Sequence, residues 1–269
     1  MSQSEKSQID CLHFPDCLPP PTRSSSERKE PPPLWRKCLA EVFGTAVLLA
    51  FGSGVVAQVN VCGLGNYLCI AIGWALGVTF GALASFRISG AHLNPAVSLA
   101  SCVYKQMPWK ELLPYVVSQV VGAFIGACIT YLCYYQDFEV QDLSNAGVFA
   151  TYPREGNNAF NSFVNEVVGS ALLTAAIAAI TDAQDETPAN RFIVAGFVGL
   201  VVLVIGLSFG VNTGYAINPA RDFGPRLFSA LAGWGSQVFT ADNYYFWVPI
   251  VGPLVGGTLG MGIQRLILW

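Results

Sequence analysis

The sequence predicts an all-α membrane protein with six transmembrane helices and two re-entrant half-helices, arranged as an inverted repeat. Three observations carry this prediction: an apolar composition, six long apolar runs, and an Asn-Pro-Ala triplet that occurs twice. Of the 269 residues, 53% are hydrophobic and only 12% are charged, whereas soluble domains carry about 25% charged residues. We therefore expect lipid to solvate much of the surface. The net charge of −3 gives no reason to expect a nucleic-acid partner.

Six apolar runs are long enough to cross a bilayer, because a hydrocarbon core of about 30 Å needs about 20 helical residues. Four runs contain no charged residue, and the other two contain one acid each, Glu41 or Glu166. Backbone groups in lipid must be satisfied internally, so helices are expected, and the runs lack the alternation typical of membrane barrels. The six runs are Cys38–Val59, Tyr67–Phe86, Leu112–Tyr135, Phe163–Thr181, Phe192–Val211 and Tyr244–Ile263.

The N-terminal segment differs from the rest of the chain. Residues 1–34 contain seven prolines between Pro15 and Pro33 and a run of serines. Such a composition cannot bury a core, which predicts a disordered tail over 1–34 and one membrane domain over 35–269. Basic residues gather before the first span, whereas the loop over 60–66 has no charge. The positive-inside rule and an even number of spans then place both termini in the cytoplasm.

The chain contains an internal repeat, over about 36–135 and 160–267. Glu41 opens the pattern Glu-Val-Phe-Gly-Thr-Ala-Val-Leu-Leu, and Glu166 opens the similar pattern Glu-Val-Val-Gly-Ser-Ala-Leu-Leu. The first Asn-Pro-Ala triplet follows its acid by 53 residues and the second by 52. Each repeat holds three spans, an odd number, so the second copy is inverted. Inverted repeats place a functional site near the membrane midplane, often at broken helices.

Each Asn-Pro-Ala triplet has the pattern of a helix start, because asparagine is a good N-cap and proline suits the first helical turn. Asn94 would cap a short helix to about Val103, and Asn218 one to about Leu231. The first is too short to cross a bilayer and must be re-entrant, which is tolerated only where it lines a cavity. Inversion brings the second in from the other face, so the two N-termini meet near the centre. The triplets are Asn94, Pro95 and Ala96, and Asn218, Pro219 and Ala220.

These two boxes, the segment Ser89–Leu93 before the first and Arg221 after the second resemble the aquaporin (major intrinsic protein) family over about residues 36–267. The resemblance implies a right-handed bundle of six spans and two half-helices. It also implies a homotetramer with one pore per subunit. We expect the channel to lie in the lipid bilayer of the plasma membrane.

A finer resemblance is to the aquaglyceroporin, or glycerol facilitator, branch. Asp222 directly follows Arg221, as in glycerol facilitators, and four further residues match marker positions of that branch: Tyr134, Arg226, Pro249 and Ile250. The resemblance implies a selectivity filter made of Trp74, Gly206, Tyr215 and Arg221. Water-specific members of the family have His in place of Gly206 and Cys or Thr in place of Tyr215. Bacterial-type glycerol channels usually have Phe in place of Tyr215, so the hydroxyl here departs from their pattern.

The residues of this predicted pore have a physical role. Each half-helix N-terminus carries about half a positive charge and unpaired N–H groups. Two of them at the pore centre repel cations and protons, while Asn94 and Asn218 offer amide donors to a passing oxygen; this is the established account of aquaporin selectivity. Arg221 would be a fixed cation in the constriction, where it donates hydrogen bonds to hydroxyls and repels cations.

Two buried acids and one histidine are given supporting roles. We expect Glu41 and Glu166 to accept backbone N–H groups of the re-entrant loops, although proton-relay acids would instead indicate a transporter. His92 has no second histidine nearby, so we expect it to hold its loop rather than a metal. The eight cysteines show no metal-type spacing, and neither a disulfide framework nor a cofactor is expected.

The sequence therefore predicts a passive channel for glycerol, other small neutral polyols and water, with urea as a further candidate, that excludes protons and ions. An enzyme would need a nucleophile, an acid–base pair or a metal set, and the chain offers none of these patterns. Two alternatives stay open: a water-selective aquaporin, and an inverted-repeat secondary transporter.

Overall fold

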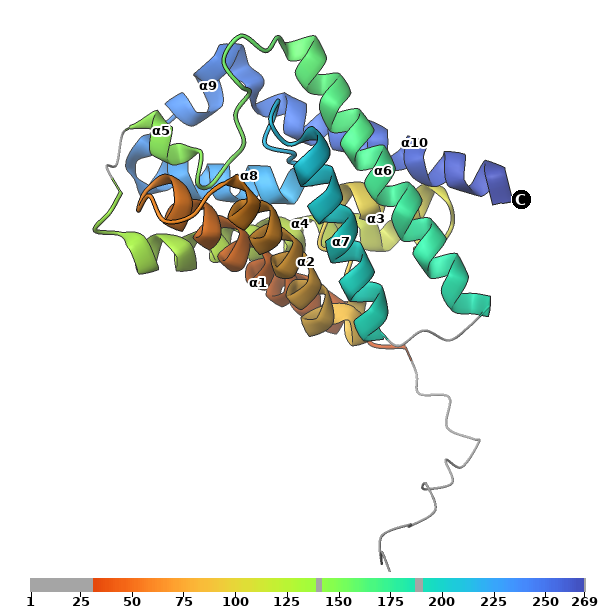
Figure 1. Ribbon diagram of the computed structural model, residues 1–269. Coiled ribbons are helices and arrows are strands. Elements are labelled where there is room, and N and C mark those ends of the chain that lie inside the picture. Colours follow the sequence, from red (N-terminus) through yellow and green to blue (C-terminus); the bar gives the residue numbers. More distant parts are fainter. Residues whose placement is uncertain (1–30, 139–141, 187–190, 269) are drawn as a thin grey trace, which may run out of the picture. The chain divides into compact units, whose positions relative to one another are not determined.

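The computed structural model describes residues 31–138, 142–186 and 191–268, without the side chains of 183–186 and 268. Residues 1–30 of the expected tail lie outside this description. Within the described residues, six helices are long and apolar enough to cross a membrane, and each predicted span coincides with one of them (Figure 1). These helices are α1 (Leu34–Asn60), α2 (Tyr67–Ser89), α4 (Trp109–Tyr134), α6 (Ala159–Glu186), α7 (Arg191–Phe209) and α10 (Val248–Leu268).

The start of the last helix differs from the prediction. The sequence suggested a span from Tyr244, but α10 begins at Val248 after a short 3₁₀ turn over Tyr245–Trp247. Asp242, Asn243 and Tyr244 have φ values of 50°, 56° and 63°. Left-handed residues cannot continue a right-handed helix, so they end the regular part of α9 (Gln237–Tyr244). The final spanning helix therefore begins four residues later than the sequence predicts, at Val248.

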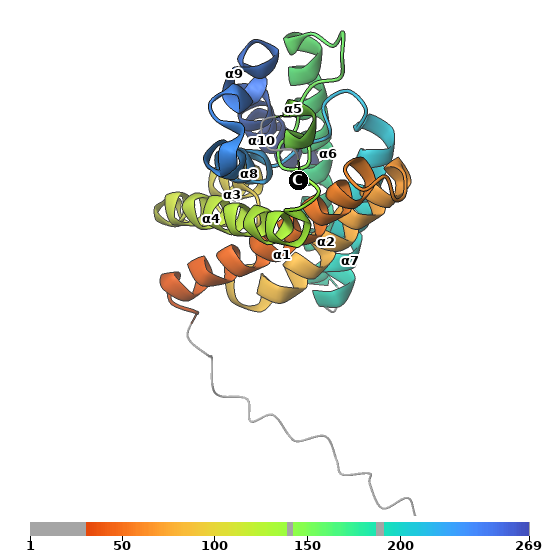
Figure 2. The same cartoon turned by 90° about the vertical axis from the view of Figure 1, so that its left-hand side faces the viewer.

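The contacts between helices repeat between the two halves. In the first half α1 packs against α2 and α4, and in the second half α6 packs against α7 and α10. The helices α2 and α7 join the halves by packing on each other. Figures 1 and 2 show the two sets of long helices on either side of the central short helices. The fold is therefore six spanning helices in an inverted repeat.

Two short helices lie end to end in the middle of the bundle (Figure 1). They are α3 (Pro95–Val103), which packs on α10, and α8 (Pro219–Ser229), which packs on α4. Each half-helix thus packs on the last span of the opposite half. A turn of π-helix over Ala230–Trp234 continues α8, and Gly233 at φ 123° ends it.

Pairs of glycines let the first and last helices of each repeat approach closely. On α4, a Cβ at Gly126 would come within 2.7 Å of the carbonyl oxygen of Ala46 on α1. The corresponding Gly260 on α10 stands against the carbonyl of Ala171 on α6, where a Cβ would overlap that oxygen. Small residues at such crossings allow backbone contact, which is a common way to join helices within a membrane.

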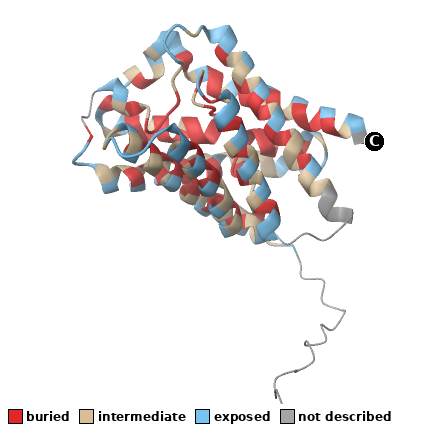
Figure 3. Cartoon of the chain, in the orientation of Figure 1, coloured by how far each residue is buried: buried red, intermediate tan, exposed pale blue. Residues whose placement is uncertain are grey.

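Exposed residues lie along the outward faces of the long helices and buried residues lie inside the bundle (Figure 3). Many of the exposed residues are large and apolar, whereas several polar and charged side chains are buried. Soluble monomers seldom expose apolar patches on this scale. Buried polar residues include Glu41 on α1 and Glu166 on α6, both 0% exposed. This distribution is expected of a protein that lipid surrounds. Many of the buried polar side chains lie on or near α3 and α8.

Candidate functional site

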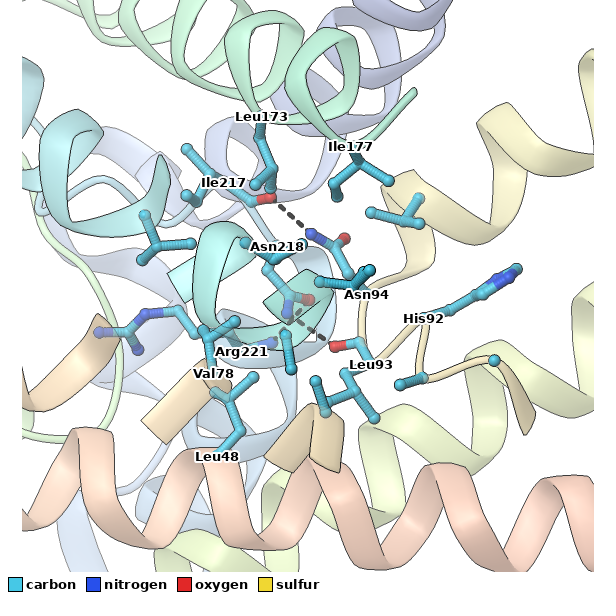
Figure 4. A pocket seen from close by; sticks show the side chains of 18 of the residues that line it. Leu48, Val78, His92, Leu93, Asn94, Leu173, Ile177, Ile217, Asn218 and Arg221 are labelled. Atoms are coloured by element: carbon cyan, nitrogen blue, oxygen red, sulfur yellow. Dashed lines mark hydrogen bonds between the residues drawn. The ribbon is translucent and has the colours of Figure 1, made fainter. Parts of the chain in front are cut away.

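A cavity of about 280 Å³ lies where the two half-helices meet. Its polar groups include Asn94, Asn218 and Arg221. Figure 4 shows the two asparagine side chains facing each other at its centre, with aliphatic side chains around them. Those aliphatic walls come from four of the spanning helices: Leu48, Val78, Leu173, Ile177, Val194 and Val202.

The two asparagines cap their helices and also bond across the repeat. The Asn94 side-chain oxygen accepts from Ala96 N at 2.8 Å, and that of Asn218 accepts from Ala220 N at 3.0 Å. The Asn94 amide nitrogen donates to Ile217 O, and the Asn218 amide nitrogen donates to Leu93 O, both at 2.8 Å (Figure 4). Because each side-chain amide has two N–H groups, one donor on each asparagine remains for a passing molecule.

The loops before the half-helices have strained backbones at matched positions. Leu93 and Ile217 have φ values of 51° and 44°, and Ala91 and Tyr215 have φ values of 56° and 39°. Such conformations cost about 1–3 kcal/mol for a non-glycine residue and persist only where the surroundings impose them. At Leu93 and Ile217, the strained residues present the two carbonyls that hold the asparagines.

Two buried carboxylates impose that backbone. Glu41 accepts from His92 N at 3.0 Å and from Leu93 N at 2.7 Å. Glu166 accepts from Ala216 N at 3.0 Å and from Ile217 N at 2.7 Å. Among the described residues that line the cavity, neither acid appears, so both carboxylates lie behind the wall rather than in the path.

Sequence reasoning missed the side chains that complete these two carboxylate sites. Gln119 of α4 donates to Glu41 at 2.8 Å and to Ser98 Oγ at 2.9 Å. In the second half, the Thr213 hydroxyl donates to Glu166 at 2.7 Å. The two sites thus differ, although the acids correspond in the repeat. No motif marks Gln119, because its partner on α1 lies far away in the sequence.

His92 lies beside the first loop. Its Nδ1 is 3.1 Å from Ser98 Oγ, and its ring meets Tyr115 edge to face with centroids 5.3 Å apart. Figure 4 shows the imidazole directed away from the two asparagines. Within the described part of the chain, no three His, Cys, Asp or Glu side chains lie together as metal ligands would.

Trp74, Arg221 and Tyr215 all line the cavity. The Arg221 guanidinium carbon lies 4.1 Å from the centroid of the Trp74 ring, a cation–π arrangement. Its Nη1 donates to Phe149 O at 3.0 Å, and the residue is only 6% exposed. Gly52 of α1 makes room for the indole, because a Cβ there would overlap the Trp74 ring.

Gly206, the fourth residue of the implied filter, stands behind the Tyr215 ring. A Cβ at Gly206 would come within 2.8 Å of Tyr215 Cζ and 3.0 Å of its Cε2. The ring therefore occupies the space that the glycine leaves, and Gly206 is not among the described residues that line the cavity. The Tyr215 hydroxyl is buried without a hydrogen-bond partner among the described residues.

Asp222 and Arg226, which match the glycerol branch, form a buried ion pair with an Nε–Oδ1 distance of 2.8 Å. Asp222 also accepts from the backbone and hydroxyl of Thr151, at 2.7 Å and 2.6 Å. This bonding fixes the segment that presents Phe149 O to Arg221, so the pair helps to hold the Arg221 guanidinium in place. Breaking one side of a buried pair usually costs about 3–5 kcal/mol.

Around this ion pair, Arg226 lies 4.7 Å from the Tyr152 ring centroid. Burial raises the pKa of the Tyr152 phenol to about 12, against the opposing effect of Arg226. Tyr134, Pro249 and Ile250, the other marker residues, are at least half-buried but do not appear among the described cavity-lining residues.

The fold and this cavity define a class: an integral, multi-pass membrane channel whose path runs between two half-helices from inverted halves of one chain. The match to the family model for the major intrinsic protein family covers residues 28–263. The chain belongs to that family.

Several known proteins are similar to this chain. Aquaglyceroporin-2 of Rhizophagus irregularis is 38% identical over 247 residues, which cover 87% of this chain and 78% of the relative. Aquaporin-7 of Mus musculus is 42% identical over 236 residues, covering 84% and 77%. The X-ray structure of the aquaglyceroporin from Plasmodium falciparum matches with a TM-score of 0.81 and 34% identity, covering 87% of this chain and 97% of that one.

Proposed function

We propose that this protein is a passive membrane channel that conducts glycerol, other small neutral polyols and water, and excludes protons and ions. One observation carries the glycerol assignment: Arg221 lines the cavity together with the aromatic residues Trp74 and Tyr215, and its guanidinium lies over the Trp74 ring. The resemblance to proteins named aquaglyceroporins supports the same assignment. Because the chain belongs to a family of passive channels, the protein is not an enzyme.

Glycerol has hydroxyls along one edge and carbons along the other, and the cavity offers a surface for each. The Arg221 guanidinium and the free amide hydrogens of Asn94 and Asn218 donate to hydroxyl oxygens. The rings of Trp74 and Tyr215 and the aliphatic walls contact the carbons. The solute exchanges its hydration shell for these groups, which lowers the barrier to crossing.

The centre of the cavity suits the exclusion of protons. Two helix N-termini point their partial positive charges at the same place, and the two asparagines donate there. A water oxygen that accepts from both asparagines has its hydrogens turned outward. Neighbouring waters then cannot pass a proton through the centre.

The two alternatives fit the geometry less well. A water-selective pore would need a narrower constriction, whereas the small Gly206 gives the Tyr215 ring room to stand back against α7. A proton-coupled transporter would need acids in the path, and both buried acids are engaged by loop donors behind the wall. The glycerol channel is therefore the function that the site favours.

Stopped-flow light scattering on proteoliposomes tests this function. We expect the protein to raise both water and glycerol permeability well above those of empty liposomes. The glycerol flux should grow in proportion to the gradient, without saturation in the millimolar range and without accumulation against a gradient. Water flux without glycerol flux would favour the water-selective alternative, and saturable accumulation would favour the transporter. Urea permeability should be measured in the same experiment, because urea is a further candidate solute.

The assembly and orientation are also part of the proposal. We infer a homotetramer in the plasma membrane, with a disordered tail over 1–34, a channel domain over 35–269 and both termini cytoplasmic. The basic residues before α1 and the six spans support the orientation. Protease added to sealed cells should leave an N-terminal tag intact. Cleavage of the tag would show that the N-terminus lies outside the cell and would contradict the proposed orientation. Light scattering in detergent should give four chains per particle.

A further inference from the structure

A tyrosine outside the proposed filter, Tyr67, bonds to the backbone of one of the filter residues. Tyr67 is the first residue of α2, and its hydroxyl donates to Gly206 O of α7 at 2.8 Å. The same carbonyl also accepts the helical bond from Gly210 N at 3.1 Å. Tyr67 thus bonds to the backbone of the residue that stands behind the Tyr215 ring.

Gly206 and Gly210, one helical turn apart, make the space in which the two tyrosines lie. A Cβ at Gly210 would overlap the Tyr67 hydroxyl oxygen and come within 2.7 Å of Tyr215 Cδ1. At Gly206, a Cβ would come within 2.8 Å of Tyr215 Cζ. The Tyr67 hydroxyl and the Tyr215 ring therefore lie side by side over these two glycines, without room for even a methyl group between them and the helix.

The Tyr215 ring is buried, at 6% exposed, and is held by packing. Its hydroxyl has no hydrogen-bond partner among the described residues. Its backbone is fixed through Thr213 and Glu166, but that fixes the start of the side chain rather than the position of the ring. The position of the ring then depends on packing, with the two glycines behind it and Tyr67 beside it.

We propose that Tyr67 is a positioning residue for solute selection, which sets the width of the constriction by holding the Tyr215 ring against Gly206 and Gly210. This inference rests on the proposed glycerol function. Tyr67 is not among the described cavity-lining residues, so it acts through Tyr215 rather than by touching the solute. If the contact is loosened, the ring gains freedom to swing and the constriction widens. If the glycines are filled, the ring moves toward the path and the constriction narrows.

The two sides of the contact predict opposite effects, measured as the ratio of glycerol to water permeability in proteoliposomes. Tyr67→Ala should raise the ratio at least about threefold, and Tyr67→Phe should raise it less, because it removes only the hydroxyl. Gly210→Ala should lower the ratio at least about threefold. The double variant Tyr67→Phe with Gly210→Ala should recover part of that loss, because the hydroxyl that the methyl group overlaps is gone.

Matched controls lie on α2 and α7. Leu68→Ala removes an exposed side chain next to Tyr67, and Gly196→Ala adds a methyl on α7 where nothing lies within 4 Å. Both should keep the wild-type ratio of glycerol to water permeability.

The inference is overturned if the Tyr67 variants leave the ratio unchanged, or lower both permeabilities in proportion, as a purely structural role would. The Tyr67 variants test the positioning role by themselves, even if Gly210→Ala does not fold. A wild-type protein without glycerol flux would instead refute the proposed function itself.

Discussion

Arg221 is a buried cation whose neighbours are a ring face and a carbonyl. The guanidinium lies over Trp74 and donates to Phe149 O, and the ion pair of Asp222 and Arg226 supports that carbonyl from behind. A charge at membrane depth costs at least about 2.5–3.5 kcal/mol. The role that we propose for Arg221, to repel cations and bind hydroxyls in the path, gives a physical reason for keeping this charge.

Replacing this cation tests its role. Arg221→Val should keep glycerol and water permeability within about threefold of wild type, while proton or cation leak becomes measurable, because the fixed positive charge is gone. Thermal stability should also fall, since an unpaired Phe149 carbonyl costs about 1–3 kcal/mol. The measurement is proton flux into liposomes loaded with a pH-sensitive dye. Arg154→Val, an exposed charge change, is the control. A folded Arg221→Val channel that stays proton-tight would remove Arg221 from charge exclusion.

Among the elements, the re-entrant loops depend most on single side chains. Glu166 holds the second loop with two backbone bonds and a bond to Thr213. Those bonds fix Ala216 and Ile217 directly before the second half-helix. The loop in turn positions both Tyr215, which lines the cavity, and the Ile217 carbonyl to which Asn94 donates.

Glu166→Gln should therefore weaken the loop as a unit. The amide keeps one acceptor oxygen and turns the other into a donor, so at least one loop donor loses its partner. Hydrogen bonds to charged groups contribute about 1.5–3 kcal/mol each, so we expect a clear fall in unfolding temperature by fluorimetry in detergent. Glycerol and water permeability should fall together. Glu155→Gln, at an exposed position, should change neither. An unaltered unfolding temperature in Glu166→Gln would show that the carboxylate does not hold the loop.

The half-helices could be predicted from the sequence because their signal is local: an asparagine cap followed by proline. The six spans were predictable from uninterrupted apolar runs. Contacts between distant segments were not. Phe149 as the partner of Arg221, Gln119 as the partner of Glu41 and Gly52 as the space for Trp74 carry no local pattern. The position of Gly206 behind the Tyr215 ring, rather than in the cavity wall, also depends on packing that no spacing reveals.

On the scale of the whole molecule, the inverted repeat explains where the channel is symmetric and where it is not. The two asparagine boxes, the strained loops and the helix contacts are duplicated. The filter is not. Counted from the boxes, Val97 corresponds to Arg221 and Ala91 corresponds to Tyr215, and both of these small apolar residues also line the cavity. The proposed filter therefore breaks the symmetry of the repeat: Arg221 and Tyr215 come from the second half, and Trp74 of α2 comes from the first.

The central claim is that glycerol and water cross through the cavity between the two half-helices. Blocking that cavity tests it most directly. Val78 of α2 lines it, whereas Val204 of α7 is 59% exposed on the outer face. Overpacking costs about 1–3 kcal/mol, so folding is checked by gel filtration, and Leu173→Trp on α6 provides a second blocked variant. Stopped-flow measurement should show glycerol and water permeability reduced at least about tenfold in Val78→Trp and unchanged in Val204→Trp. Well-folded Val78→Trp and Leu173→Trp channels that conduct glycerol like the wild type would contradict the account.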